Sequence, residues 1–475
     1  MTRTAPHLRW LLAWLVFLVY FAGVALYLRD ARHHQLADKL ATDMTAQVEQ
    51  HDVDWTLYFY GEWWSPQSIV PQPSQQGASI YLMELGYETP ELLRALLLVE
   101  ASRAYDWKYL YSWCKNWDLR TKLAQRCLAH YENDPLVYWA ACRVYLAGGE
   151  YQLAAAMFEL ARNAGFAPED IGILPEHWQG RYLAALLLSD RASDAESYLA
   201  KRVAADQADA DALYTYADFL CRLDKYEPAI EQAQLGRKRF PADPRFVGIL
   251  KRAYWWTADV DGLTTLIGLP DGSNPLHSTR YSTEIRLQLL ESDPRFFDHS
   301  APWPNPNPTY QRLFSEAYAI TGDERYLQEL IDQLQAEWRS YQDEEGHVSY
   351  RSRHNAERNS RMFSYVIRAF YLAHDWASLS ANLEHYDDLS GWDNIEIWET
   401  GLVLRAVASG TPITEFDCSQ LLNTNLLPFL LHSSHFDAAV KASGRPRKQV
   451  FDEIIAATTP YRGQYSDYSN GALDW

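Results

Sequence analysis

Two segments in the C-terminal third of the chain contain residue types that could act on a carbohydrate. The first is HVSYRSRHNAERNSR, which begins at His347, and the second is GWDNIEIWETG, which begins at Gly391. Together they supply cations, carboxylates, an imidazole and indole rings. The residues with this chemistry are Arg353, His354, Arg358, Trp392, Glu396, Trp398 and Glu399.

These residue types fit two reactions. Glycoside hydrolysis uses two carboxylates across a sugar-binding cleft, and tryptophan rings often form the floor of that cleft. A lyase uses a base such as His or Tyr, with Arg or Asn neutralising charge. In a chain with 62 acidic residues, however, carboxylates occur in most segments. A solvated loop explains the first segment equally well, and core packing of the tryptophans explains the second. We therefore assign no catalytic residue and keep the seven as candidate glycan contacts.

No motif points to a cofactor or a metal. The chain contains no G-x-G-x-x-G, P-loop, H-E-x-x-H or G-x-S-x-G sequence. Its five cysteines form no C-x-x-C pair and have no histidine at metal-ligand spacing, so we expect small buried apolar residues. The cysteines are Cys114, Cys127, Cys142, Cys221 and Cys418. The formal net charge of -19 argues against a nucleic-acid partner, because phosphate binding needs a basic surface.

The elements that must position these residues are predicted to be helices throughout. No stretch shows the sustained two-residue alternation of a strand, and prolines gather in a few breaks. The fold class is therefore all-α. The predicted parts are a head at 1–9, a transmembrane helix at 10–28, a juxtamembrane helix and linker at 29–88, helical repeats at 89–269, a Pro-rich linker at 270–308, a C-terminal helical domain at 309–457 and a Tyr-rich tail at 458–475.

The membrane segment reads WLLAWLVFLVYFAGVALYL from Trp10 to Leu28, without a charged residue. At about 1.5 Å rise per residue, this run is long enough for a hydrocarbon core of roughly 30 Å. A cleaved signal peptide is the alternative, but the small residues Gly23 and Ala25 lie inside the run rather than after it. We therefore expect residues 10–28 to contact the lipid bilayer.

The sequence contains opposing signals on the compartment that holds the body of the protein. Positive charges on the two sides of the span nearly balance, so the positive-inside rule does not choose an orientation. A short head before one span is the usual form of a bacterial anchor with an external body, whereas free cysteines favour a reducing compartment. We favour a single-pass inner-membrane protein with a periplasmic body.

Two stretches resemble the tetratricopeptide repeat (TPR), in which a tight turn joins two helices. The first follows Asp134-Pro135, and it has the turn GGEY and then the small–aromatic–small face of Ala154, Phe158 and Ala161. The second is ALYTYADFLCRLDKYEPAIEQAQLGRKRFPADP, with its turn at DKY. A looser copy lies between them. The spacing is uneven, with 41 residues from Ala154 to Ala195 and 34 from there to Ala229.

This resemblance implies stacked helix pairs with a shared core and a concave groove. In this family the groove usually holds a peptide or a partner helix. The candidate groove residues are Tyr138, Tyr145, Tyr182, Tyr214 and Tyr216. An irregular helical bundle is the alternative. The segment EAYAITGDERYLQELIDQL forms a further predicted helix–turn–helix, and it also resembles the hairpins of α/α-toroid domains in glycoside hydrolases and polysaccharide lyases.

The resulting functional prediction is a non-enzymatic, membrane-anchored scaffold that binds other proteins. Envelope assembly or polysaccharide export is the expected setting, by analogy of architecture. The alternative is an envelope protein that binds or processes polysaccharide through its C-terminal helices. The basic residues Arg445, Arg447 and Lys448 are expected to form a small patch that faces water.

Overall fold

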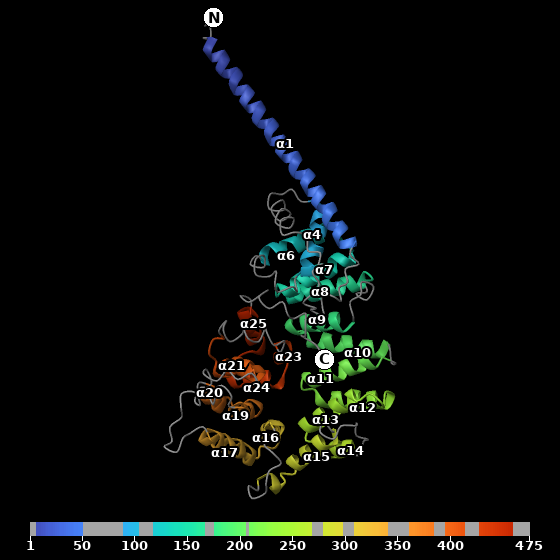
Figure 1. The fold of residues 1–475 in the computed structure, drawn as a ribbon, viewed down its shortest axis with the longest axis vertical. Helices are drawn as coiled ribbons and strands as arrows, with labels where there is room; N and C mark the ends of the chain where they lie inside the picture. Colours follow the sequence, from blue (N-terminus) through green and yellow to red (C-terminus); the bar gives the residue numbers. More distant parts are fainter. Residues whose placement is uncertain are drawn as a thin grey trace. The chain divides into compact units, whose positions relative to one another are not determined.

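The computed structural model describes residues 6–50, 89–103, 117–166, 175–205, 209–267, 279–297, 308–340, 361–383, 395–413 and 427–458. Every regular element in these ranges is helical, which confirms the all-α prediction for this part of the chain. The described residues form two compact units, one ending at Ala185 and one beginning at Leu186 (Figure 1).

Unit 1 contains α1 (Pro6–Gln50), α4 (Pro90–Arg103), α6 (Trp117–His130), α7 (Pro135–Ala147), α8 (Tyr151–Asn163) and most of α9 (Pro175–Leu188). The start of α7 is fixed by Asp134, which accepts hydrogen bonds from the N–H groups of Leu136 and Val137. In the core of the unit, the Phe158 ring stacks on Tyr182 with 4.2 Å between centroids. Large rings between α7, α8 and α9 therefore hold this unit together.

The long helix α1 has two different halves. Large apolar side chains in its first half are exposed, among them Tyr20 at 70% and Leu28 at 60%. In its second half, Leu40 is buried and the helix packs on α4. Among the described residues, no helix combines the length and the hydropathy needed to cross a membrane. The transmembrane helix at 10–28 thus stays a prediction.

Unit 2 contains the remaining helices, and they pack mainly on their neighbours in chain order (Figure 1). They are α10 (Ala192–Ala205), α11 (Ala210–Arg222), α12 (Tyr226–Arg239), α13 (Arg245–Trp256), α14 (Val260–Ile267), α15 (Thr279–Leu290), η3 (Pro294–Phe297), α16 (Pro308–Thr321), α17 (Glu324–Ser340), α19 (Arg361–Leu372), α20 (Trp376–Leu383), α21 (Ile395–Ser409), α23 (Leu427–Leu430), α24 (Ser434–Ser443) and α25 (Arg447–Thr458). Fully buried alanines at 217, 229 and 233 let α11, α12 and α13 approach closely.

The hairpins of unit 2 share one turn geometry. A residue with positive φ follows the first helix of these hairpins, and in five of them the next N–H donates to the carbonyl five residues back, as Lys225 does to Leu220 at 2.9 Å. This is the Schellman pattern of helix ends. At Gly322 the glycine N–H donates to the Tyr318 carbonyl instead, four residues back. The left-handed residues Asp190, Asp224, Ala258 and Ser292 lie 34 residues apart, and Gly322 and His374 follow. The chain therefore builds four successive turns at a constant period.

The predicted linker at 270–308 contains a helix. Residues 279–290 form α15, and the helices before and after this stretch belong to the same unit. The physical reason is local, because the prolines occur at the two ends of the stretch and the sequence TRYSTEIRLQLL between them has none. The Pro-rich segments themselves, at 268–278 and 298–307, lie outside the described residues, as does the predicted tail from 459.

Candidate functional site

Five hairpins of unit 2 carry a charged side chain six residues before the left-handed turn residue. The left-handed residue ends each first helix in the same way, so a constant offset places these side chains at corresponding points of consecutive hairpins. We call them the charge ladder: Asp218 on α11, Arg252 on α13, Arg286 on α15, Glu316 on α16 and Arg368 on α19. In unit 1, Arg143 has the same relation to Gly149.

The first part of the ladder is centred on Asp218. Its carboxylate accepts hydrogen bonds from Arg222 Nε at 2.8 Å and from Arg252 Nη2 at 2.5 Å, and its side chain is only 6% exposed. Burial acts to lower the pKa of Arg252, but the charge of Asp218 raises it above its ordinary value. One carboxylate therefore compensates the two cations that contact it closely.

The second part is centred on Glu316, whose carboxylate is also 6% exposed. It accepts hydrogen bonds from Trp255 Nε1 at 2.9 Å, from Arg312 Nε at 3.1 Å and from Arg368 Nη2 at 3.0 Å. The donors come from α13, α16 and α19, so one side chain ties three helices together. These three hydrogen bonds fix the position of the Glu316 carboxylate and orient it toward Trp255, Arg312 and Arg368.

Two more cations, Arg286 and Lys251, lie close to each other without a carboxylate of their own, and the charge of Glu316 acts on Arg286. The Arg286 guanidinium lies over the Trp255 ring, 5.6 Å from its centroid, and donates to the Ser282 carbonyl at 3.0 Å. Lys251 Nζ donates to Ser282 Oγ at 3.1 Å. Within the described residues, neither cation has an acidic group at ion-pair distance. We call Lys251, Trp255, Arg286, Arg312, Glu316 and Arg368 the Glu316 cluster.

The Glu316 cluster has four cations and one carboxylate. Burial lowers the pKa of Lys251 to about 8, and the charge of Arg286 acts in the same direction. Burial also lowers the pKa of Arg286, and Glu316 only partly opposes this effect. Since the whole chain has a net charge of -19, this is a local concentration of positive charge on an acidic protein. Several cations gathered at one point form an arrangement that can bind an anionic group.

A histidine pair lies near the end of the ladder. His374 Nε2 and His435 Nδ1 are 2.7 Å apart, and the Tyr371 ring is 4.7 Å from His435. Burial lowers the pKa of both imidazoles, so the pair is neutral at pH 7. In the described part of the chain, no group of three His, Cys, Asp or Glu side chains could hold a metal ion.

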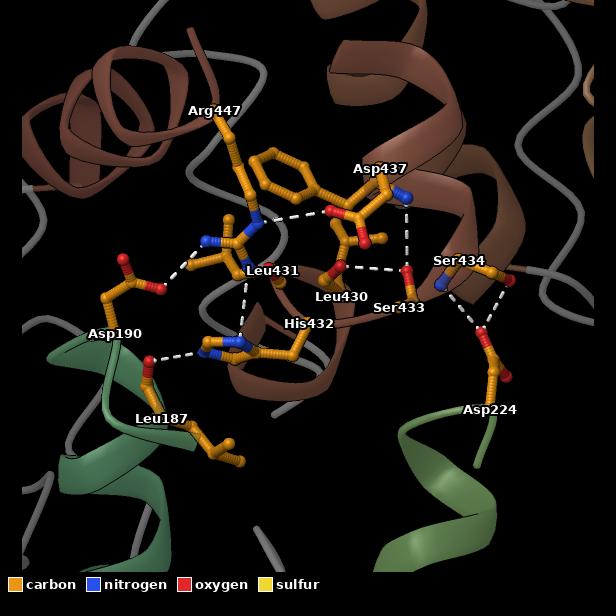
Figure 2. Close-up of polar contacts among 11 residues, drawn as sticks. Leu187, Asp190, Asp224, Leu430, Leu431, His432, Ser433, Ser434, Asp437 and Arg447 are labelled. Carbon is orange, nitrogen blue, oxygen red and sulfur yellow. Dashed lines mark hydrogen bonds and ion pairs between the residues drawn. The ribbon is translucent and has the colours of Figure 1, made fainter. Parts of the chain in front are cut away.

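The C-terminal helices are tied to the first turns of unit 2 (Figure 2). Arg447 forms ion pairs with Asp190 at 2.8 Å and with Asp437 at 3.1 Å. Ser434 donates to Asp224 from its backbone N–H and its hydroxyl, at 2.8 and 2.7 Å. His432 bonds the Leu187 carbonyl at 2.7 Å. We call these contacts the clasp. The prediction that the basic patch faces water is therefore wrong for Arg447, because the Asp190 carboxylate, 257 residues away in sequence, binds its guanidinium.

The five candidate groove tyrosines have different environments. Tyr145 and Tyr182 are 2% and 5% exposed, so they belong to the core of unit 1 and offer no groove surface, which corrects that prediction for these two. The ring of Tyr182 packs on Phe158, and its hydroxyl donates to Glu159 at 3.2 Å. Tyr138, Tyr214 and Tyr216 are half-buried, and they remain candidates for contact with a partner.

The seven candidate glycan contacts cannot be assembled into a site. Arg353, His354, Arg358 and Trp392 lie outside the described residues. The backbone of Glu396, Trp398 and Glu399 lies in α21, but their side chains are outside the described part. Of the cysteines, Cys127, Cys142 and Cys221 are buried, as predicted, and burial raises the pKa of the Cys142 thiol to about 12. Cys114 and Cys418 are outside the described ranges.

Sequence reasoning missed the charge ladder, although part of its signal is present. Asp218, Arg252 and Arg286 are 34 residues apart, the same spacing as Ala195 and Ala229. Extending that period would have identified three of the five members. Glu316 and Arg368 follow at 30 and 52 residues, so only the turn geometry relates them. No family model and no curated protein matches the chain.

Proposed function

We propose that this chain is a membrane-anchored helical scaffold that binds other proteins through the first helices of its unit 2 hairpins. The observation that carries the proposal is the recurrence of charged side chains at one position of five successive hairpins. A solenoid aligns equivalent positions of its repeats along one face, and such faces bind partners. On this face the carboxylates Asp218 and Glu316 are buried, so contact with a partner falls to the more exposed side chains beside them, such as Arg252 at 40%. The half-buried Tyr214 precedes Asp218 by one helical turn on α11, so it adds an aromatic contact to the same row.

A TPR-like architecture is part of this proposal. The constant 34-residue spacing of the four left-handed turns supports it, because 34 residues is the length of that repeat. Buried small residues where the helices meet, such as Ala217 and Ala229, support it further. The later hairpins depart from the period, so we propose the resemblance for residues 190–292 in particular.

The membrane anchor rests on the apolar run from Trp10 to Leu28 and on its exposed side chains in α1. Exposed large apolar residues in this number need a cover, and lipid is the cover that we propose for them. We propose an inner-membrane location with the body in the periplasm, in envelope assembly or polysaccharide export. We expect the full-length protein to stay in the membrane fraction during extraction with alkaline carbonate. A variant that lacks residues 1–29 should be released from that fraction.

The scaffold itself is tested by crosslinking in membranes, extraction of the full-length chain in detergent, and identification of what co-purifies. The informative variant is the double substitution of Tyr214→Ala and Tyr216→Ala, compared with Tyr198→Ala on the second helix α10 as a matched control. We expect specific protein partners that the double variant loses and the control keeps. Retention of polysaccharide without any protein partner would instead favour the glycan-binding alternative.

A further inference from the structure

We propose that the Glu316 cluster binds a carboxylate presented by an acidic segment of a partner protein. The inference rests on the proposed scaffold function and deepens it by naming the chemistry of the partner. The segment would place its carboxylate beside Arg286 and Lys251.

The charge balance differs along the ladder. Asp218 contacts two arginines, whereas Glu316 contacts two arginines and also acts on a third, Arg286, which has Lys251 as a neighbour. Half-buried like charges repel one another strongly unless an anion lies between them. Arg286 and Lys251 share Ser282 as an acceptor, and a hydroxyl and a carbonyl carry no net charge. An added anion at this point would relieve the repulsion, so this part of the ladder favours an anionic ligand.

Free hydrogen-bond donors are present at the same point. The Nε atoms of Arg286 and Arg368 are buried without an acceptor in the described part of the chain. Those two Nε atoms are closed to solvent, so a ligand would approach the partly buried Lys251 and Arg286 and the Arg312 side chain, which is 63% exposed. Guanidinium groups and an ammonium supply several N–H donors, and a carboxylate can accept hydrogen bonds from them. The Trp255 ring beneath Arg286 holds that guanidinium in place.

The small extent of the positive region favours a protein carboxylate over a polyanion. A polyuronate or a nucleic acid needs a row of uncompensated cations along its length. On this ladder the neighbouring cation, Arg252, is already bound by Asp218, so the excess charge is confined to the Glu316 cluster. A single acidic side chain of a protein segment matches this pattern.

The test measures binding of an oligoglutamate peptide to the full-length chain in detergent by calorimetry. Inorganic phosphate and polygalacturonate serve as the two other probes. Lys251→Gln and Arg286→Gln remove cations of the cluster, and Lys441→Gln removes an exposed lysine of the same unit as the matched control. Glu316→Gln removes the competing carboxylate. Circular dichroism and the melting temperature of each variant establish that it is folded.

We expect the peptide to bind the wild type and the Lys441→Gln control equally, and to bind Arg286→Gln about tenfold more weakly, the effect of losing one charge-assisted hydrogen bond. Glu316→Gln should bind more tightly. The inference is overturned if all variants bind alike, if no probe binds, or if phosphate or polygalacturonate binds and the peptide does not. Capture of the same partner proteins by Arg286→Gln and wild type would also overturn it, while leaving the scaffold function intact. Peptide binding without any captured partner would overturn the scaffold instead.

Discussion

The two carboxylates of the charge ladder have nearly the same burial and very different surroundings. Asp218 and Glu316 are each 6% exposed, and each accepts arginine hydrogen bonds. Around Asp218, the carboxylate more than offsets the cost of burial, since the pKa of Arg252 lies above its ordinary value. Around Glu316, burial outweighs the carboxylate, since the pKa of Arg286 and that of Lys251 lie below theirs. The two carboxylates are thus equally buried, but only Asp218 offsets the cost of burying its arginine partner. Around Glu316, positive charge stays uncompensated.

The largest effect is expected from Glu316→Gln. The substitution leaves the buried Arg368 and its neighbour Arg312 without a carboxylate, and breaking a buried ion pair costs about 3–5 kcal/mol. Chemical denaturation monitored by far-UV circular dichroism measures the loss. Asp218→Asn is the comparison, and it should cost less because its two arginines are 32% and 40% exposed, whereas Arg368 is 14% exposed. Equal losses for the two variants would remove the distinction between the two parts of the ladder.

Substitutions of Arg252 and Arg286, two of the three ladder arginines, should have different effects on the free energy of unfolding. Arg252→Met breaks the hydrogen bond to Asp218 and should lower the free energy of unfolding by about 1–3 kcal/mol. Arg286→Met removes a cation that lacks a carboxylate and retains its apolar stem over Trp255, so we expect a change within about 0.5 kcal/mol or a gain. Denaturant midpoints of the two variants provide the measurement. A large loss for Arg286→Met would show that its guanidinium is compensated after all.

Lys251→Met should stabilise the protein, in a manner that depends on pH. The pKa of Lys251 is about 8 in the folded protein, against 10.5 when unperturbed. Below pH 8 the Lys251 amine is protonated in both the folded and the unfolded state, so the folded protein bears the whole free-energy cost of burying the ammonium. Between pH 8 and 10.5 the folded state has released it, so the wild type gains stability as pH rises.

We therefore expect the advantage of Lys251→Met to be about 1–2 kcal/mol at pH 7 and to shrink by pH 10. Denaturation at both pH values tests this, with the exposed Lys441→Met as a control that should show no such pH dependence. An advantage that is constant with pH would contradict the burial of the Lys251 ammonium.

The smallest effect concerns the turns that keep the ladder in register. Ala258 has φ of +53° and Gly322 has φ of +68° at corresponding turns. Ala258→Gly should stabilise the protein and Gly322→Ala should destabilise it, each by about 0.5–1 kcal/mol, because a Cβ is disfavoured in the left-handed region. No atom lies within 4 Å of a Cβ built on Gly322, so the backbone alone sets the cost. Thermal melts of both variants should shift in opposite directions.

The sequence predicted the helices well and the charge ladder poorly. Apolar periodicity and short polar turns are local signals, so the helical hairpins and the buried Cys142 and Cys221 could be inferred. The pairing of Glu316 with Trp255 joins residues 61 positions apart and depends on how hairpins stack. The environment of Arg447 depends on a contact across 257 positions. Local patterns carry no information on contacts of this kind, and a basic patch in sequence looked solvated for that reason.

The clasp has a consequence for how unit 2 unfolds. A linear array of helical hairpins loses structure from its ends, because each terminal hairpin has one neighbour where the others have two. In unit 2 the turns at Asp190 and Asp224 receive Arg447 and Ser434 from the last helices, so the first and last hairpins each gain a second neighbour. End fraying is thereby suppressed at both ends at once. Hydrogen exchange in unit 2 should accordingly resemble that of a cooperative globular domain, with protection that does not decline toward either end of the array.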